Sequence, residues 1–133
     1  MAQTIAFDLV SPDRLLVSTE AEMVIVPGTE GDFGTMAGHQ PLISALRPGV
    51  VAVHDGGSIS DRYFVRGGFV EVTNERCTIL AEEAIPVADL DRAAIEQRIQ
   101  DAEKDLANAG SDEERHRGDD ELRTLNELLT AGP

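Results

Sequence analysis

Cysteines, aromatic side chains and long apolar runs are scarce in this chain. Its 133 residues include one cysteine, one tyrosine and no tryptophan. The lone Cys77 excludes an internal disulfide and any metal site built from several thiolates, and we expect a small buried or edge thiol. Because aromatics are few, valine, isoleucine, leucine and alanine must build the core, which is a composition suited to strands.

No apolar run approaches the length of a membrane-spanning segment, which needs about 18 such residues. The first residues, Met1 to Thr4, also lack the basic and apolar regions of a signal peptide. We therefore expect a protein that stays in the compartment where it is made. The same lack favours a bacterial chain over an imported organellar one.

Positive charge is also in short supply. Twenty-five acidic side chains against eleven basic ones give a formal net charge of −14. Such a field repels nucleic acid and anionic lipid head groups. We expect neither nucleic-acid binding nor direct insertion into lipid.

The first two thirds of the chain, from Ile5 to about Ile85, carry apolar residues in short runs with a period near two, as half-buried strands do. Turn signals such as Asp55-Gly56-Gly57 and Thr73-Asn74-Glu75 separate them. Six or more short strands at this spacing favour a β-sandwich or barrel. The runs are Ile5 to Leu9, Glu22 to Val26, Val50 to Val53, Tyr63 to Val65, Phe69 to Val72 and Thr78 to Ala81.

Glycine and proline are concentrated between Gly28 and Gly49, in GTEGDFGTMAGHQPLISALRPG, around a Leu42-Ile43 pair that we expect to be buried. This much backbone punctuation predicts a shaped loop. A second pair, Gly67-Gly68, interrupts two strand-like runs. It predicts a bulge or a close approach of two backbones.

After Pro86 the apolar period becomes helical. One narrow stripe is formed by Leu90, Ile95, Ile99, Ala102 and Leu106. Asp89 or Asp91 can cap the start of this helix, and Asn108-Ala109-Gly110 marks its end. Ser111-Asp112-Glu113-Glu114 then has the form of a capping box that opens a second helix.

The second helix is lopsided. Its bulky apolar side chains are Leu122, Leu125, Leu128 and Leu129, whereas the stretch from Asp112 to Glu121 has none and contains Gly118. We expect its first half to fray and the hairpin to be held lightly enough to populate a second arrangement. The predicted fold is mainly β within the α+β class, with a sandwich over residues 1–86 and a helical hairpin over 87–133.

Evidence for catalysis is thin. His39 with Asp32 or Asp55 could serve a small hydrolase, but the neighbouring residues offer no nucleophile. The three histidines lack metal-ligand spacing. The Gly28 to Gly34 segment fits neither phosphate-binding pattern, because no Lys-Ser/Thr pair and no helix follow it. We expect no metal, no cofactor and no catalytic residue.

One ordered series of motifs runs through most of the chain: Glu30-Gly31-x-Phe33-Gly34, His39-x-Pro41-Leu42, Pro48-Gly49 and Gly67-Gly68-Phe69. With the strand and helix pattern around it, this series resembles the epsilon subunits of bacterial F-type ATP synthases. The resemblance implies an N-terminal antiparallel β-sandwich followed by an antiparallel two-helix hairpin. It also implies a non-catalytic rotor subunit on the cytoplasmic face of the inner membrane, linking the gamma subunit to the c ring and coupling proton translocation to ATP synthesis.

The resemblance also assigns contacts. The residues that match the c-ring contact of the family are Glu30, Gly31, Asp32, Phe33, His39 and Leu42. We expect Phe33 to be exposed there, because an apolar side chain flanked by acids suits a protein contact. The alpha and beta subunits are further candidate partners, through the hairpin.

Some epsilon subunits bind ATP through an [Ile/Leu]-Asp-x-x-Arg-Ala motif at the start of the first hairpin helix. The matching residues are Leu90-Asp91-Arg92-Ala93-Ala94-Ile95, so Ala94 replaces the arginine and the motif is incomplete. A phosphate site then lacks its guanidinium, unless Arg92 or Arg98 supplies it. A small nucleotide-sensing module is the main alternative function, and a free-standing β-sandwich binding domain is another.

The charge of the hairpin bears on inhibition, which in some family members involves basic side chains that meet an acidic loop of the beta subunit. From Arg98 to Pro133 there are five basic and ten acidic residues. An acidic partner would repel this segment. We expect weak inhibition or none.

Overall fold

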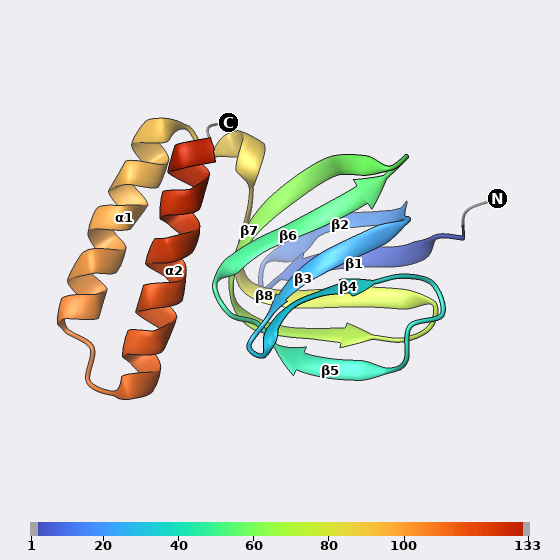
Figure 1. Cartoon of the computed structure of the whole chain (residues 1–133), viewed down its shortest axis with the longest axis horizontal. Helices are drawn as coiled ribbons and strands as arrows, with labels where there is room; N and C mark the ends of the chain where they lie inside the picture. Colours follow the sequence, from blue (N-terminus) through green and yellow to red (C-terminus); the bar gives the residue numbers. More distant parts are fainter. Residues whose placement is uncertain (1–2, 132–133) are drawn as a thin grey trace.

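Eight strands precede two helices in the computed structural model, which describes residues 3–131 (Figure 1). The strands are β1 (Ile5–Ser11), β2 (Arg14–Ala21), β3 (Met23–Gly28), β4 (Gly31–Thr35), β5 (Leu42–Ala45), β6 (Gly49–Asp55), β7 (Ser58–Val72) and β8 (Arg76–Pro86). A short 3-10 turn, η1 (Val87–Asp89), leads to α1 (Arg92–Ala107) and α2 (Asp112–Ala131). The predicted class, a mainly β sandwich followed by a two-helix hairpin, is confirmed; its predicted ends at residues 1 and 133 lie outside the described residues.

The strands form one sheet folded into a sandwich, and the two helices stand side by side against it (Figure 1). The order along the sheet is β2-β1-β8-β7-β6-β3-β4, with β5 paired to β7. Neighbours in the described sheet are antiparallel except β1 and β8, which run parallel. The predicted antiparallel sandwich therefore contains one parallel pair, because β8 returns beside the first strand.

The longest strand, β7, joins the two layers. Its first half pairs with β6 and its second half with β5, so the runs predicted as two strands are one. Between the halves Gly67 and Gly68 have φ angles of +72° and +100°. A Cβ at Gly68 would lie 1.9 Å from the carbonyl oxygen of Leu80. The predicted close backbone approach is confirmed, and no other residue type fits it.

The aliphatic core lies between the layers. Its largest fully buried members come from β1, β3, β6, β7 and β8, and the cluster includes Phe7, Leu9, Val24, Val26, Val51, Val70 and Ile79. Cys77 belongs to this core, as expected for a buried thiol. Burial raises the pKa of Cys77 to about 11, with a smaller rise from Asp8 and an opposing hydrogen bond to Thr35. Such a thiol is inert near neutral pH.

The hairpin begins and ends as its local sequence predicts. The Asp91 side chain accepts a hydrogen bond from the Ala94 N–H at 2.7 Å and so caps α1. Asn108 ends this helix. At the start of α2 the Ser111 hydroxyl accepts from the Glu114 N–H at 3.1 Å, and the Glu114 carboxylate accepts from the Gly110 N–H at 2.8 Å. Both ends of the connection are thus capped locally.

A second apolar cluster fastens the hairpin to the sandwich. It joins Phe64 of β7 to Val87, Leu90, Ile95, Ala102, Leu125 and Leu128. Gly118, which weakens α2 by its helix propensity, also has a packing role: a Cβ there would lie 2.9 Å from Cδ1 of Leu106. Its missing side chain lets the two helices approach closely.

Candidate functional site

The predicted ring-contact residues are divided between the turn before β4, strand β4, the loop after it and strand β5. Glu30, Gly31 and Asp32 are exposed. The expectation of an exposed Phe33 is wrong, because its ring is half-buried and packs on the sandwich core. The rings of Phe33 and His39 lie 6.5 Å apart, so the fold brings these two residues together.

Leu42 and Ile43 correct a second expectation. They are 39% and 67% exposed rather than buried, because β5 lies at the side of the sheet and pairs only with the second half of β7. The loop before them is anchored elsewhere, since the Gly38 N–H donates to the Asn74 carbonyl at 2.8 Å. An exposed apolar pair on an edge strand suits a contact with another protein better than open water.

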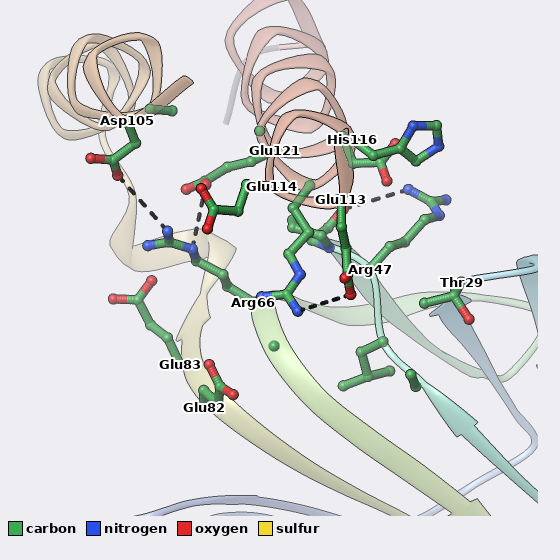
Figure 2. A pocket seen from close by; sticks show the side chains of 18 of the residues that line it. Thr29, Arg47, Arg66, Glu82, Glu83, Asp105, Glu113, Glu114, His116 and Glu121 are labelled. Carbon is green, nitrogen blue, oxygen red and sulfur yellow. Dashed lines mark hydrogen bonds and ion pairs between the residues drawn. The ribbon is translucent and has the colours of Figure 1, made fainter. Parts of the chain in front are cut away.

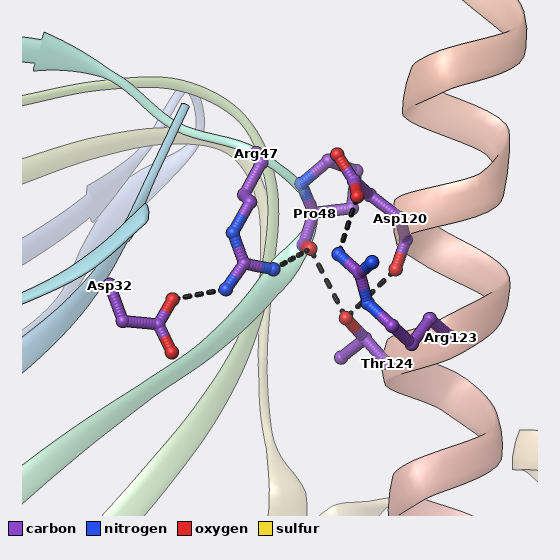
Figure 3. Close-up of polar contacts among 6 residues, drawn as sticks. All are labelled: Asp32, Arg47, Pro48, Asp120, Arg123 and Thr124. Carbon is purple, nitrogen blue, oxygen red and sulfur yellow. Dashed lines mark hydrogen bonds and ion pairs between the residues drawn. The ribbon is translucent and has the colours of Figure 1, made fainter. Parts of the chain in front are cut away.

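Asp32 is held by a residue that sequence reasoning missed. Arg47, in the segment between β5 and β6, forms an ion pair with the Asp32 carboxylate (Figure 3). The Arg47 side chain is one-fifth exposed and that of Asp32 is 55% exposed. Glu30 has no ion pair among residues 3–131, so it is the free carboxylate at this edge.

A row of apolar side chains crosses the outer face of the sheet, and sequence reasoning missed it too. Strand register places Ala45 opposite Phe69, Phe69 opposite Leu80, Leu80 beside Val10, and Val10 opposite Leu15. Of these, Leu15, Phe69 and Leu80 are 58%, 45% and 37% exposed. We call these five residues the outer stripe. Apolar surface on this scale, drawn from five strands, is typical of a protein interface.

Charged side chains surround a cavity of about 930 Å³ between the hairpin and the sandwich (Figure 2). Arg66 of β7 reaches across it to both helices. Its Nε lies 3.4 Å from a carboxylate oxygen of Glu121 on α2, and its Nη2 lies 3.9 Å from Asp105 on α1. Arg98 of α1 pairs with Glu83 of β8 and lies over the Phe64 ring at 5.2 Å. These contacts tie the hairpin to the sandwich by charge as well as by apolar packing.

Glu121 is the buried acid of this cluster, with an exposed fraction of 6%. Burial raises the pKa of its carboxyl, Arg66 and Arg98 lower it, and Glu83 and Asp105 raise it. A carboxyl with a raised folded-state pKa stabilises the docked hairpin most at low pH, and this contribution is lost as the pH rises through that pKa. Although the charged carboxylate pairs with Arg66, the cost of its burial is larger, so protonated Glu121 stabilises the folded chain more than charged Glu121 does.

We expect the stability of the chain to fall, relative to that of a Glu121→Gln variant, as the pH rises from about 4 to about 8. The glutamine keeps the shape but cannot ionise. Urea-unfolding midpoints measured across this range test the expectation, with the exposed Glu127→Gln in the same helix as the control. Parallel curves for the chain and the Glu121→Gln variant would contradict it.

The geometry gives little support to a metal site or to a hydrolase. Among residues 3–131 no group of three or more His, Cys, Asp or Glu side chains is arranged to hold a metal ion. His39 Nδ1 donates to the Gln40 carbonyl at 2.6 Å, and Asp32 pairs with Arg47 rather than with His39. Neither contact supplies the activated nucleophile that a hydrolase needs, so the hydrolase alternative gains no support from them.

The nucleotide motif depends on its register. Read two residues earlier, Asp89, Arg92 and Ala93 fit Asp-x-x-Arg-Ala, with Ala88 where isoleucine or leucine is expected. The Arg92 Nε lies 3.2 Å from Glu96 on the exposed side of α1. Arg98, the other candidate guanidinium, is engaged by Glu83. The nucleotide-sensing alternative is thus closer to the motif than the first register indicates, and stays a prediction.

These features define the chain as a β-sandwich with exposed apolar side chains and a docked helical hairpin. Residues 4–87 match the family model of the ATP synthase delta/epsilon chain β-sandwich domain. The ATP synthase epsilon chain of Parvibaculum lavamentivorans is 50% identical over 128 residues, which cover 96% of this chain and 97% of that one. The epsilon chain of Rhodospirillum rubrum is 52% identical over 115 residues, 86% of each chain.

Solved structures agree with these relatives. A chain in the cryo-EM structure of the Euglena gracilis mitochondrial ATP synthase, OSCP/F1/c-ring, has a TM-score of 0.73 and 26% identity, covering 98% of this chain and 82% of that one. A chain of the Tetrahymena thermophila central stalk and c ring shares the fold, with a TM-score of 0.66 and 10% identity over 96% of this chain and 97% of that one. The chain belongs to the bacterial ATP synthase epsilon-chain family, whose members are non-catalytic subunits of that complex. Within residues 3–131 no helix has the length and apolarity needed to cross a membrane.

Proposed function

We propose that this chain is a rotor subunit that links the gamma subunit to the c ring, so that proton-driven rotation of the ring reaches the catalytic sites. The observation that carries the proposal is the pair of exposed surfaces on one sandwich, the outer stripe and the edge around Phe33 and His39. A close-packed interior transmits strain, so a sandwich resists shear between two partners better than a loop-rich adaptor does. Membership of the complex implies a peripheral position at the cytoplasmic face of the inner membrane.

The outer stripe is the proposed contact with gamma. It offers large apolar side chains in a row, flanked by the polar Asp8, Thr78 and Glu71 in the next register position. An apolar centre with a polar rim is the usual anatomy of a stable protein interface. The sheet behind it is fixed by the core, so the stripe is preorganised.

The proposed ring contact is the edge formed by Glu30, Gly31, Asp32, Phe33, His39 and Leu42. Glu30 supplies a free carboxylate, and Leu42 with the half-buried Phe33 supplies apolar area. This combination fits a ring loop that presents basic and apolar side chains. Residues 1–86 would then carry both rotor contacts, and residues 87–133 would form a regulatory unit.

Proton pumping driven by ATP tests the coupling role. Membranes stripped of this chain should hydrolyse ATP with little pumping, and adding the chain back should restore pumping. Depleted membranes that pump as well as reconstituted ones would contradict the proposal.

The hairpin is proposed to inhibit weakly, because it is acidic and the beta-subunit loop that it meets in some family members is acidic too. We expect a chain truncated after Asp89 to leave ATP hydrolysis by the reconstituted enzyme within about twofold, since like charges disfavour the inhibitory contact. A full-length Glu113→Lys, Asp119→Lys variant should inhibit more strongly than the natural chain. A several-fold rise in hydrolysis on truncation would contradict weak inhibition.

A further inference from the structure

The short segment between β5 and β6 is a junction of three parts of the molecule. Leu46 forms an isolated bridge with Gly28, at the turn that leads to Glu30, and its N–H donates to the Gly68 carbonyl at 3.0 Å. The Arg47 N–H donates to the Pro27 carbonyl at 3.0 Å. The segment is therefore fixed to the edge turn and to the β7 corner.

The same segment also reaches the hairpin (Figure 3). The Thr124 hydroxyl of α2 lies 3.2 Å from the Pro48 carbonyl oxygen and 2.9 Å from that of Asp120, and Thr124 is 5% exposed. Arg47 Nη1 lies 3.5 Å from the same Pro48 oxygen, while its Nη2 pairs with Asp32. The Arg47 guanidinium thus connects the exposed Asp32 to the Pro48 carbonyl, which also contacts Thr124 of the hairpin.

The Arg47 side chain also shares a cavity with acidic side chains of the hairpin. A Cβ at Gly49 would lie 2.6 Å from Cβ of Pro27 and 3.4 Å from Arg47 Nη1, so it would collide with Pro27 and only touch the guanidinium. On its other side Arg47 lines the cavity under the hairpin, together with Glu113, Glu114 and Asp120 of α2 (Figure 2). Glu113 and Asp120 already pair with Arg117 and Arg123 of the same helix, and the Glu114 carboxylate accepts from the Gly110 N–H. An Arg47 released from Asp32 would therefore join these acids as a further cation.

We propose that Arg47 couples the ring-contact edge to the docking of the hairpin. A basic side chain of the ring that engages Asp32 releases Arg47 toward the acids of α2, and the hairpin is then held more firmly on the sandwich. The ring as the source of that basic side chain rests on the proposed function, whereas the coupling through Arg47 belongs to this chain alone. Linkage makes the effect reciprocal: a docked hairpin makes Asp32 more available to a partner.

Hydrogen exchange in the isolated full-length chain tests the coupling. The Asp32→Asn variant imitates an Asp32 that no longer holds Arg47, and Glu30→Gln removes the same charge at the same edge without touching an ion pair. We expect Asp32→Asn to slow exchange of the α2 amides from Leu122 to Leu128 about threefold, the range of a partly exposed ion pair. Glu30→Gln should change them little.

Repeating the Asp32→Asn substitution in an Arg47→Gln chain completes a double-mutant cycle. There, Asp32→Asn should no longer alter exchange of α2, because the shared cation is gone. Equal effects of Asp32→Asn and Glu30→Gln, faster exchange in Asp32→Asn, or an Asp32→Asn effect that survives in Arg47→Gln would each overturn the proposal. Exchange of the core amides of β7 should stay the same in all variants, which shows that the sandwich remains intact.

The ring itself is tested separately, so the two failures are distinguishable. If the cycle succeeds but added c ring neither binds the chain nor slows exchange of α2, the rotor assignment fails and the coupling stands. If the ring binds while the cycle fails, the rotor role stands without the coupling.

Discussion

Replacing Gly68 by alanine is expected to prevent stable folding of the sandwich. A Cβ at this position would lie 1.9 Å from the Leu80 carbonyl oxygen and 2.9 Å from Cα of Ala81, both backbone atoms of the paired strand β8. The φ angle of +100° adds strain for any residue with a side chain. Relief requires separating β7 from β8, so we expect a loss above about 4 kcal/mol, a large part of the total stability of a domain.

Gly57→Ala is the matched control for this substitution. Its φ angle of +82° is also positive, but nothing lies within 4 Å of the added Cβ. The backbone strain alone should cost about 1–2 kcal/mol. Circular dichroism and urea unfolding of both variants separate strain from collision. A Gly68→Ala chain as stable as Gly57→Ala would mean that β7 and β8 do not approach as described.

A Leu80→Glu substitution in the outer stripe is expected to abolish measurable binding to the gamma subunit. Leu80 lies at the middle of the stripe, between Phe69 and Val10. A charge buried at the centre of an interface without a partner, together with the lost apolar contact, should weaken binding at least about 30-fold. Calorimetric titration of purified gamma subunit with each variant measures this effect.

Ile59→Glu is the control, because Ile59 is 51% exposed and lies on β7, the strand next to that of Leu80, ten residues from Phe69. It adds the same charge at an exposed apolar position outside the stripe; Leu80 itself is 37% exposed. We expect gamma to bind this variant as it binds the natural chain, and both variants should unfold at similar urea concentrations. Equal weakening by the two substitutions would show that the stripe is not the contact.

The sequence predicted the parts of the fold that depend on local interactions. Helix α1 begins after Asp91 and the capping box at Ser111 opens α2, because a cap involves residues three positions apart. The turn at Gly56-Gly57 also forms where predicted, with both glycines at positive φ. Alternating apolar residues identified β1, β3, β6 and β8, since each has one face in the core.

Features that depend on distant partners were predicted poorly. β2 was missed because Arg14 to Val17 do not alternate in the way a half-buried strand does, and only the edge position of this strand permits that pattern. The sequence predicted that Leu42 and Ile43 are buried, because an apolar pair is usually buried. In the structure both lie on β5 and are exposed. Whether a side chain on an edge strand is buried depends on which other elements cover that strand, and the local sequence pattern does not reveal this.

The proposed contact surfaces were also predicted only in part, because they depend on residues far apart in the sequence. Motif resemblance indicated Asp32 and Phe33, but not that Arg47, fifteen positions away, holds Asp32. No local sequence pattern predicts the outer stripe, because its five residues come from five strands and only the strand register brings them into one row. The link from Pro48 to Thr124 spans 76 positions and has no sequence signal.

The rotor assignment is tested most directly by isolating this chain, tagged at its C-terminus, from gently solubilised membranes of its own host. The proteins that co-purify with it are then identified. We predict recovery of the alpha, beta, gamma and c subunits in fixed ratio by mass spectrometry, with the Leu80→Glu chain recovered without them and the Ile59→Glu chain with them. Recovery of the natural chain alone from the soluble fraction would contradict the account and leave a free β-sandwich binding module as the better description.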